Sequence, residues 1–266
     1  MKNYSNSMNF GVCKLCKCTK ELQRSHVIGR SIFRRMMKNS GDHFLVNADT
    51  RNKEIKKSTD QFVSYQLCAA CESYLNSKYE NYSLWSLMNK QKGVKHCDGN
   101  IALLILGLDQ YRVIMYVISI IWRAVNSDHT AFSQSKIYPE LNEYFRMCIL
   151  DEVHIDEKKV FVKISKLICV RNKYSEEKLQ GFIIPPMLKK DGNNGISYSM
   201  IFGGFYFEVF VPLVDSFNRY GLGVLRRKKH ILRIPKVNFL QIPEVFNSIQ
   251  KTIEVHNNNK DIKGSY

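Results

Sequence analysis

The sequence predicts an α+β fold, and three observations along the chain lead to this prediction. Two CxxC pairs lie in a basic N-terminal region, residues 1–83, which has few long apolar runs. Apolar residues at helical spacing follow in residues 84–157, and alternating, β-branched segments dominate residues 158–266. We therefore expect a small metal-bound domain, a helical middle segment and a β-rich C-terminal domain whose role the sequence does not indicate.

The composition indicates a chain that can bury a core and bind a polyanion. Of the 266 residues, 44% are hydrophobic and 12% are aromatic, which argues against global disorder. Forty Lys and Arg residues against 24 Asp and Glu residues give a formal net charge of +16. This excess favours nucleic acid as the partner, although a solvated basic surface has the same composition.

The first ten residues, MKNYSNSMNF, contain no apolar stretch typical of a signal peptide. We therefore expect a cytoplasmic protein, and in a reducing compartment paired cysteines bind metal more often than they form disulfides. The apolar residues 101–125 are numerous enough to span a membrane, but Asp109 and Arg112 would each cost about 2.5–3.5 kcal/mol to insert. We predict instead a buried helix, divided near Gly107, and no membrane association.

Local patterns place further elements. Pro139 suits the first position of a helix, and apolar residues follow it at helical spacing. The C-terminal domain contains a strong turn signal, KKDGNNG, between two apolar segments. We predict strands in KVFVKISKLICV, GFIIPPML, SYSMIFGGFYFEVFVP and HILRIPKVNFLQIP, and a final helix in EVFNSIQKTIEV.

The two cysteine pairs predict a structural zinc site. Cys13 and Cys16 form the first CxxC motif, and Cys68 and Cys71 form the second. Two such motifs in one small basic domain are typical of a tetrahedral four-thiolate zinc site. Cys18 extends the first motif and is an alternative ligand. The remaining thiols are expected in the core: Cys97, Cys148 and Cys169.

The segments that follow each cysteine pair predict more than a zinc finger. Ser25 and His26 end a polar segment and precede two aliphatic residues, which is typical of a strand that presents a histidine at its end. Glu72, Asn76 and Glu80 follow the second pair at i, i+4 and i+8 of a helical segment, so they share one face. The same zinc therefore brings a base and a carboxylate together, unless His26 is a structural histidine.

These motifs resemble the HNH or ββα-metal (His-Me finger) nucleases. The resemblance rests on CxxC, the strand ending in SH with aliphatic residues after it, and LCAACE at the start of a helix; it covers residues 10–82. It is greatest to the four-cysteine kind, the phage junction-resolving nucleases of the endonuclease VII type. A group of bacterial proteins with the motif SHI(I/V)P and LCxxCE, some encoded near anti-phage defence genes, is also similar.

The resemblance implies roles for the site residues. His26 would be the general base that activates water, and Glu72 and Asn76 would help to hold a catalytic Mg²⁺ or Mn²⁺. The residue before the histidine is usually an acid that binds this ion, and here it is Ser25. Either Glu72, Asn76 or Glu80 supplies the missing ligand, or activity is conditional or lost.

A basic segment after His26 is a candidate for contacts to the phosphate backbone. In GRSIFRRMMKN, apolar residues line one face of a predicted helix and basic residues cover the rest. These basic residues either bind nucleic acid or form a solvated face: Arg30, Arg34, Arg35 and Lys38. Residues 53–61 are expected to be a loop, with Asp60 as a minor ligand candidate.

The resulting hypothesis is a metal-dependent HNH-type endonuclease that cuts DNA and contains a structural zinc. The similarity to proteins encoded near defence genes suggests a role against phage. Two alternatives stay open: a zinc-containing module that binds nucleic acid without cutting it, and a non-catalytic subunit of a larger complex. DNA is the expected partner, and a homo-oligomer or a partner protein in a defence complex is compatible with each reading.

Overall fold

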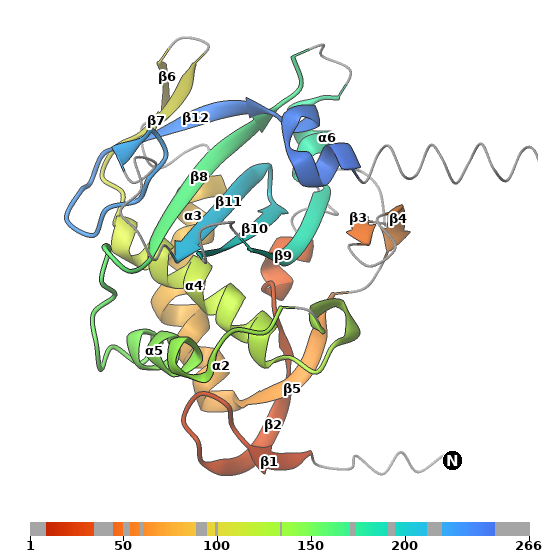
Figure 1. The fold of residues 1–266 in the computed structure, drawn as a ribbon, viewed down its shortest axis with the longest axis vertical. Helices are drawn as coiled ribbons and strands as arrows, with labels where there is room; N and C mark the ends of the chain where they lie inside the picture. The colour runs from red at the N-terminus through yellow and green to blue at the C-terminus, as the bar shows by residue number, and fades with distance from the viewer. Residues whose placement is uncertain are drawn as a thin grey trace, which may run out of the picture.

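Two β-sheets and one central helix organise the chain (Figure 1). The computed structural model describes residues 9–34, 45–49, 54–58, 61–88, 95–98, 101–133, 135–170, 174–190, 195–211 and 220–247. Of residues 45–49, 54–58 and 95–98 only the backbone is described. Helices and strands occur along the whole described chain, so the predicted mixture of α and β structure is confirmed.

The smaller sheet contains three antiparallel strands in the order β1-β2-β5. These strands are β1 (Phe10–Val12), β2 (Thr19–His26) and β5 (Val63–Cys68). A continuous helical segment follows β5 directly: α2 (Ala69–Leu75), the π-helical turn η1 (Asn76–Glu80) and α3 (Asn81–Met88). This part of the molecule therefore consists of two paired strands and a helix, preceded by the short edge strand β1.

The larger sheet has nine strands in the order β4-β3-β9-β10-β11-β8-β12-β7-β6. Its pairs are antiparallel except β3 with β9 and β8 with β12, which are parallel. The strands are β3 (Leu45–Asp49), β4 (Glu54–Ser58), β6 (Lys95–Asp98), β7 (Ala102–Ile105), β8 (Phe161–Ile168), β9 (Phe182–Lys190), β10 (Ile196–Phe202), β11 (Phe205–Val211) and β12 (Leu232–Asn238).

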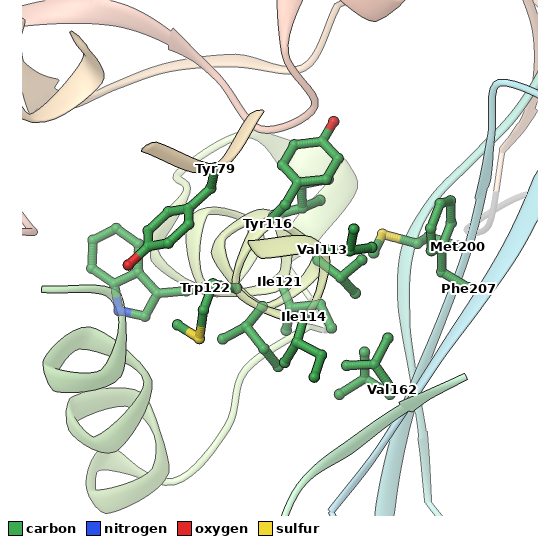
Figure 2. Packing of buried hydrophobic residues seen from close by; sticks show 14 of the residues in the cluster. Tyr79, Val113, Ile114, Tyr116, Ile121, Trp122, Val162, Met200 and Phe207 are labelled. Carbon is green, nitrogen blue, oxygen red and sulfur yellow. The ribbon is translucent and has the colours of Figure 1, made fainter. Parts of the chain in front are cut away.

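Helix α4 (Gln110–Asn126) contacts strands β8 and β9 of the large sheet and also packs against η1 and α3 (Figure 1). The Asp109 side chain caps its first turn by accepting a hydrogen bond from the backbone N–H of Arg112 at 3.3 Å. Apolar residues surround nearly its whole circumference, which is typical of a helix buried on all sides. Figure 2 shows Ile114 beside Val162 of β8, and Trp122 on another side of the helix beside Tyr79.

The remaining helices are short or peripheral. Helix α5 (Pro139–Ile149) packs against α4 and begins with Pro139 at its first position, as predicted. The others in the described part of the chain are the helical residues 30–34, η2 (Thr130–Phe132), α6 (Glu176–Gln180), η4 (Phe239–Gln241) and a helical turn at residues 243–247. One cluster of buried apolar side chains includes residues from all three predicted domains, such as Leu67, Trp122 and Phe207. All three predicted domains contribute to this one core, and their division into separate domains stays a prediction.

Two sequence-based expectations about local structure were wrong. The first half of the apolar segment 101–125 is strand β7 and not a helix, although the break falls at Gly107 (φ 66°) as expected. A short apolar run fits a strand and a helix equally well, and pairing with β6 and β12 decides it. Residues 54–58, expected in a loop, form β4 at the edge of the large sheet, where lysine-rich strands are common.

The middle segment is accordingly mixed in structure, because β6 and β7 precede α4. The predicted strands of the C-terminal domain are confirmed as β8 to β12. Of the predicted final helix, residues 244–247 are helical and the rest lie outside the described residues. None of the helices in the described ranges combines the length and the apolar character that a membrane span requires.

Trp122 tests the importance of α4 for stability. Trp122 is 1% exposed, so Trp122→Ala should remove about 3–5 kcal/mol from the free energy of unfolding. Trp85→Ala is a matched control, since Trp85 is 42% exposed and should lose less than half as much. Urea unfolding followed by circular dichroism measures both. Equal losses in the two variants would contradict the central position of α4.

Candidate functional site

Four cysteines from two distant segments meet at one end of the small sheet. Cys13 and Cys16 lie in the turn after β1, Cys68 ends β5 and Cys71 lies in the first turn of α2. Their Sγ atoms all lie within 4.8 Å of one another, and the Sγ atoms of Cys16 and Cys68 are 3.9 Å apart. Ligand sulfurs of a tetrahedral zinc with bonds of about 2.3 Å are roughly 3.8 Å apart, so this spacing fits a four-thiolate zinc site.

Backbone hydrogen bonds shape the turn that carries the first pair. The N–H of Lys17 donates to the carbonyl of Cys13, and the N–H of Cys13 donates to the carbonyl of Cys18, both at 2.9 Å. Lys17 adopts a left-handed conformation, with φ at 62°. The N–H of Cys68 donates to Cys13 Sγ at 3.4 Å, a bond typical of thiolates that bind metal.

The electrostatics of the four thiols favour a bound cation. Burial raises the pKa of Cys13, but hydrogen bonds with the backbone of Cys16, Cys68 and Leu15 outweigh this effect and lower the pKa to about 7. Burial and the negative charge on Cys13 raise the pKa of Cys71. A divalent cation would relieve the repulsion among several buried thiolates, and an all-sulfur donor set suits zinc.

Three other cysteines whose side chains are described, Cys18, Cys148 and Cys169, lie outside this cluster. Cys18 is exposed, and its thiol donates to the carbonyl of Cys16 at 3.5 Å. Cys148 and Cys169 are buried core thiols, as expected. The side chain of Cys97 lies outside the described residues. The zinc prediction thus stands on Cys13, Cys16, Cys68 and Cys71, which are positioned to hold a metal ion.

His26 is the last residue of β2 and is half-buried. Its Nε2 atom lies 3.0 Å from Oε1 of Gln61, the residue two before β5. Between Gln61 and β5, Phe62 has a φ of 53°, which is unusual for a large side chain. The Phe62 ring is buried against Phe33 and Phe132, and this packing holds the strained backbone that places Gln61 opposite the imidazole.

The surroundings of His26 keep its imidazole neutral. Burial lowers the pKa of His26, and the positive charges of Arg30 and Arg123 lower it further. The hydrogen bond with Gln61 and the negative charge of Glu72 act in the opposite direction, but the net pKa is below the usual value of 6.5. At neutral pH the ring therefore has a lone pair available to accept a proton.

Glu72 lies in the first turn of α2, and its negative charge interacts electrostatically with the His26 imidazole. Its Oε2 atom is buried and has no hydrogen-bond partner among the described residues. Leaving a buried carboxylate oxygen unpaired costs at least about 1–3 kcal/mol, and a cation is one group that would satisfy it. Asn76 lies one helical turn after Glu72, where α2 passes into the π-helical turn η1. Glu72 and Asn76 are thus oxygen-bearing side chains on the helix that follows the cysteine cluster.

Glu80 lies in a buried ion pair. Ser31 Oγ donates to its Oε1 atom at 2.7 Å, and Arg123 Nη2 lies 3.7 Å from its Oε2 atom. Arg123 is fully buried and also donates from Nη1 to the carbonyl oxygen of His26 at 2.8 Å. The Glu80–Arg123 pair thus holds the backbone of His26 in place, and the carboxylate of Glu80 is engaged there.

Ser25 has a different environment from its neighbour. Its side chain is fully buried, and Oγ donates to the carbonyl of Gln23 at 3.4 Å. Because successive residues of a strand point to opposite faces, Ser25 lies on the face of β2 away from the His26 imidazole. The structure therefore places Glu72 within electrostatic range of His26 and directs Ser25 to the other face, while a shared site with Asn76 stays a prediction.

Two of the four predicted basic contacts can be placed. Arg30 and Arg34 are exposed and lie four residues apart in the helical residues 30–34, so they share a surface close to His26. Ile32 and Phe33 are fully buried, as the amphipathic pattern predicts. The other residues of this hypothesis lie outside the described residues: Arg35, Met36, Met37, Lys38 and Asp60.

Sequence reasoning gave neither Gln61 nor Arg123 a role in the site. Gln61 ends a charged segment without a recognisable motif, and Arg123 lies in an apolar helix. Comparison with known proteins adds no further residue, because no family model, curated protein or solved structure matches this chain.

The zinc assignment predicts different outcomes for Cys68, which belongs to the cluster, and Cys18, which lies two residues after Cys16 but outside the cluster. Cys68→Ser should lose about one equivalent of zinc and destabilise residues 9–34 and 61–88, because binding energy at a structural zinc is folding energy. Cys18→Ser should keep its zinc and its melting temperature, since Cys18 lies outside the cluster. Metal analysis and thermal melting measure both variants. Full zinc content in Cys68→Ser would refute the ligand set.

Proposed function

We propose that the chain is a metal-dependent endonuclease of the HNH type that hydrolyses phosphodiester bonds in DNA. The observation that carries the proposal is the buried, unpaired Glu72 carboxylate oxygen, within electrostatic range of a neutral His26 and next to four clustered cysteines. Further support comes from the order of elements. Two antiparallel strands, β2 and β5, precede a helix, with the histidine at a strand end and the carboxylate on the helix.

In this proposal His26 is the general base. Its Nε2–H donates to Gln61 Oε1, which leaves the lone pair of the imidazole on Nδ1. The lowered pKa keeps the ring unprotonated at neutral pH, so Nδ1 can take a proton from the attacking water. Gln61 fixes the tautomer and the ring orientation, and Arg123 fixes the backbone through the His26 carbonyl.

Glu72, with Asn76, would hold a single Mg²⁺ or Mn²⁺, since both ions prefer oxygen ligands. The chemistry that such an ion supplies is neutralisation of the charge that develops on the phosphate and the leaving oxygen. The exposed Arg30 and Arg34 would hold the phosphates on either side of the cleaved bond. The net charge of +16 strengthens binding to the DNA backbone.

A second candidate function has one observation in its favour. Ser25 replaces the acid that usually binds the ion in the nucleases that this sequence resembles, and its hydroxyl is bonded to Gln23. A zinc-containing module that binds nucleic acid without cleaving it is therefore the alternative. A role in defence against phage is proposed from the resemblance alone.

Cleavage of plasmid DNA distinguishes the two functions. Wild-type protein should nick plasmid with Mg²⁺ or Mn²⁺ and not with EDTA, while His26→Ala should be slower by about 10²-fold or more. Glu72→Gln should also be slower, and raised Mn²⁺ should restore part of its rate. His154→Ala is a matched control, since His154 is exposed and lies outside the site.

Three results would decide the matter. Wild-type rates in zinc-loaded His26→Ala would exclude His26 as the base. Unchanged rates in Glu72→Gln would exclude Glu72 as an ion ligand. Absence of cleavage by the wild type, combined with salt-dependent DNA binding that weakens in Arg30→Gln or Arg34→Gln, would favour the binding module.

The pH dependence tests the protonation state of His26. A base must be unprotonated, so the single-turnover rate should rise with pH through the lowered pKa of His26 and be constant at neutral pH. The Gln61 hydrogen bond raises this pKa, so Gln61→Leu should move the rising part of the profile to lower pH while it lowers the constant rate. Rates between about pH 5 and pH 8 measure this. A shift of the Gln61→Leu profile to higher pH would contradict the assigned hydrogen bond.

A further inference from the structure

A pocket of about 680 Å³ lies at the end of the helical segment that begins with the zinc ligand Cys71 and Glu72. The end of α3 (Leu87 and Met88) forms one wall, together with the end of β8, helix α6, the β10–β11 turn and β12. Its volume lies within the range of roughly 300–1,000 Å³ typical of small-molecule sites. None of the residues assigned above to the nuclease site lines it.

Two lysines on neighbouring strands converge in this pocket. Lys166 of β8 and Lys236 of β12 are register partners in a parallel pair, and both line the pocket. Lys166 is only 8% exposed; its Nζ lies 2.7 Å from Glu176 Oε1 and 4.8 Å from the centre of the Phe205 ring. Among the described residues that line the pocket, the charged ones are Lys166, Lys236 and Glu176.

Two amines side by side favour phosphate over carboxylate. Strands in a sheet are about 4.8 Å apart, so two ammonium groups on one face can reach different oxygens of one phosphate. A carboxylate is better matched by the planar fork of arginine, whereas lysine acts as a compact point charge. A phosphate monoester carries about −1.5 to −2 charges, which suits the two lysines. Glu176 pairs with Lys166, but its side chain is half-exposed and can move into solvent when a phosphate binds.

The turn between β10 and β11 is adapted to this pocket. Gly203 and Gly204 both have positive φ, at 60° and 80°. A Cβ atom on Gly204 would lie 3.2 Å from Lys166 Nζ, and one on Gly203 would lie 1.8 Å from Met88 Cε. The two glycines therefore let the backbone approach both the amine and the apolar wall.

The remainder of the pocket suits a flat apolar group. Its walls include aliphatic side chains and the aromatic residues Phe205 and Tyr174. Tyr174 is 44% exposed, and an edge-to-face contact with Phe239 at 5.5 Å holds its ring. Exposed aromatic rings of this kind provide surfaces on which nucleobases stack.

We propose that this pocket binds a nucleoside phosphate, with the phosphate between Lys166 and Lys236 and the base against Phe205, Tyr174 and the aliphatic wall. The proposal does not depend on the nuclease function, because it rests on a separate set of residues. Since α3 continues the helix that carries Glu72, a ligand here contacts the same helical segment as the candidate active site.

Isothermal titration calorimetry of the full chain tests the proposal. The probes are AMP, GMP, CMP and UMP, their four nucleosides, and inorganic phosphate. At least one nucleotide should bind about tenfold or more tightly than its nucleoside, and Lys166→Gln and Lys236→Gln should each weaken it by a similar factor, as loss of a hydrogen bond to a charged group does. Lys178→Gln, the same change at an exposed position of α6 outside the pocket, should bind like the wild type.

Lys236→Gln keeps the test decisive if the buried Lys166 is needed for folding, which thermal melting of each variant reports. Absence of binding by all four nucleotides would overturn the proposal. So would unchanged affinity in a folded Lys236→Gln variant. Binding that persists in Lys236→Gln but is lost in Arg30→Gln would place the nucleotide at the candidate nuclease site and would likewise overturn it.

Discussion

The contact between the two cysteine pairs is the constraint on which the candidate site depends. Cys16 and Cys68 are 52 residues apart in sequence, and their sulfur atoms lie 3.9 Å apart. This contact fixes the turn after β1 against the start of α2, so that the end of β2 and the first turn of α2 lie beside each other. The four cysteines are positioned to hold a metal ion, and a zinc ion there would supply such a link with four bonds. The approach of His26 and Glu72 follows from the same link.

The large sheet and its central helix supply the second constraint. Arg123 of α4 is fully buried between the His26 carbonyl and the Glu80 carboxylate, so the candidate site extends beyond the segments that carry the four clustered cysteines. Removing one member of a buried ion pair leaves an uncompensated charge, which destabilises a protein by about 3–5 kcal/mol. The geometry at His26 is thus coupled to the packing of α4 on the nine-stranded sheet.

Features that depend on residues close together in the sequence could be predicted, and features that depend on contacts between distant segments could not. CxxC spacing is a local signal, so the four cysteines that cluster could be named from the sequence, and the roles of His26 and Glu72 were predicted from their position beside them. Gln61 owes its place to the backbone of Phe62, and Arg123 to a helix that joins the site only in the tertiary structure. Strand β7 and the Lys166–Lys236 pair depend on strand order in the large sheet, which no short segment encodes.

We propose one zinc site and one separate oxygen-ligand site side by side in this chain. Anomalous diffraction from crystals soaked in Mn²⁺, recorded at the zinc and manganese absorption edges, would locate both ions. We expect a zinc peak among Cys13, Cys16, Cys68 and Cys71, and a manganese peak within bonding distance of Glu72. A zinc peak elsewhere, or ordered Glu72 and His26 side chains with no manganese between them, would contradict it.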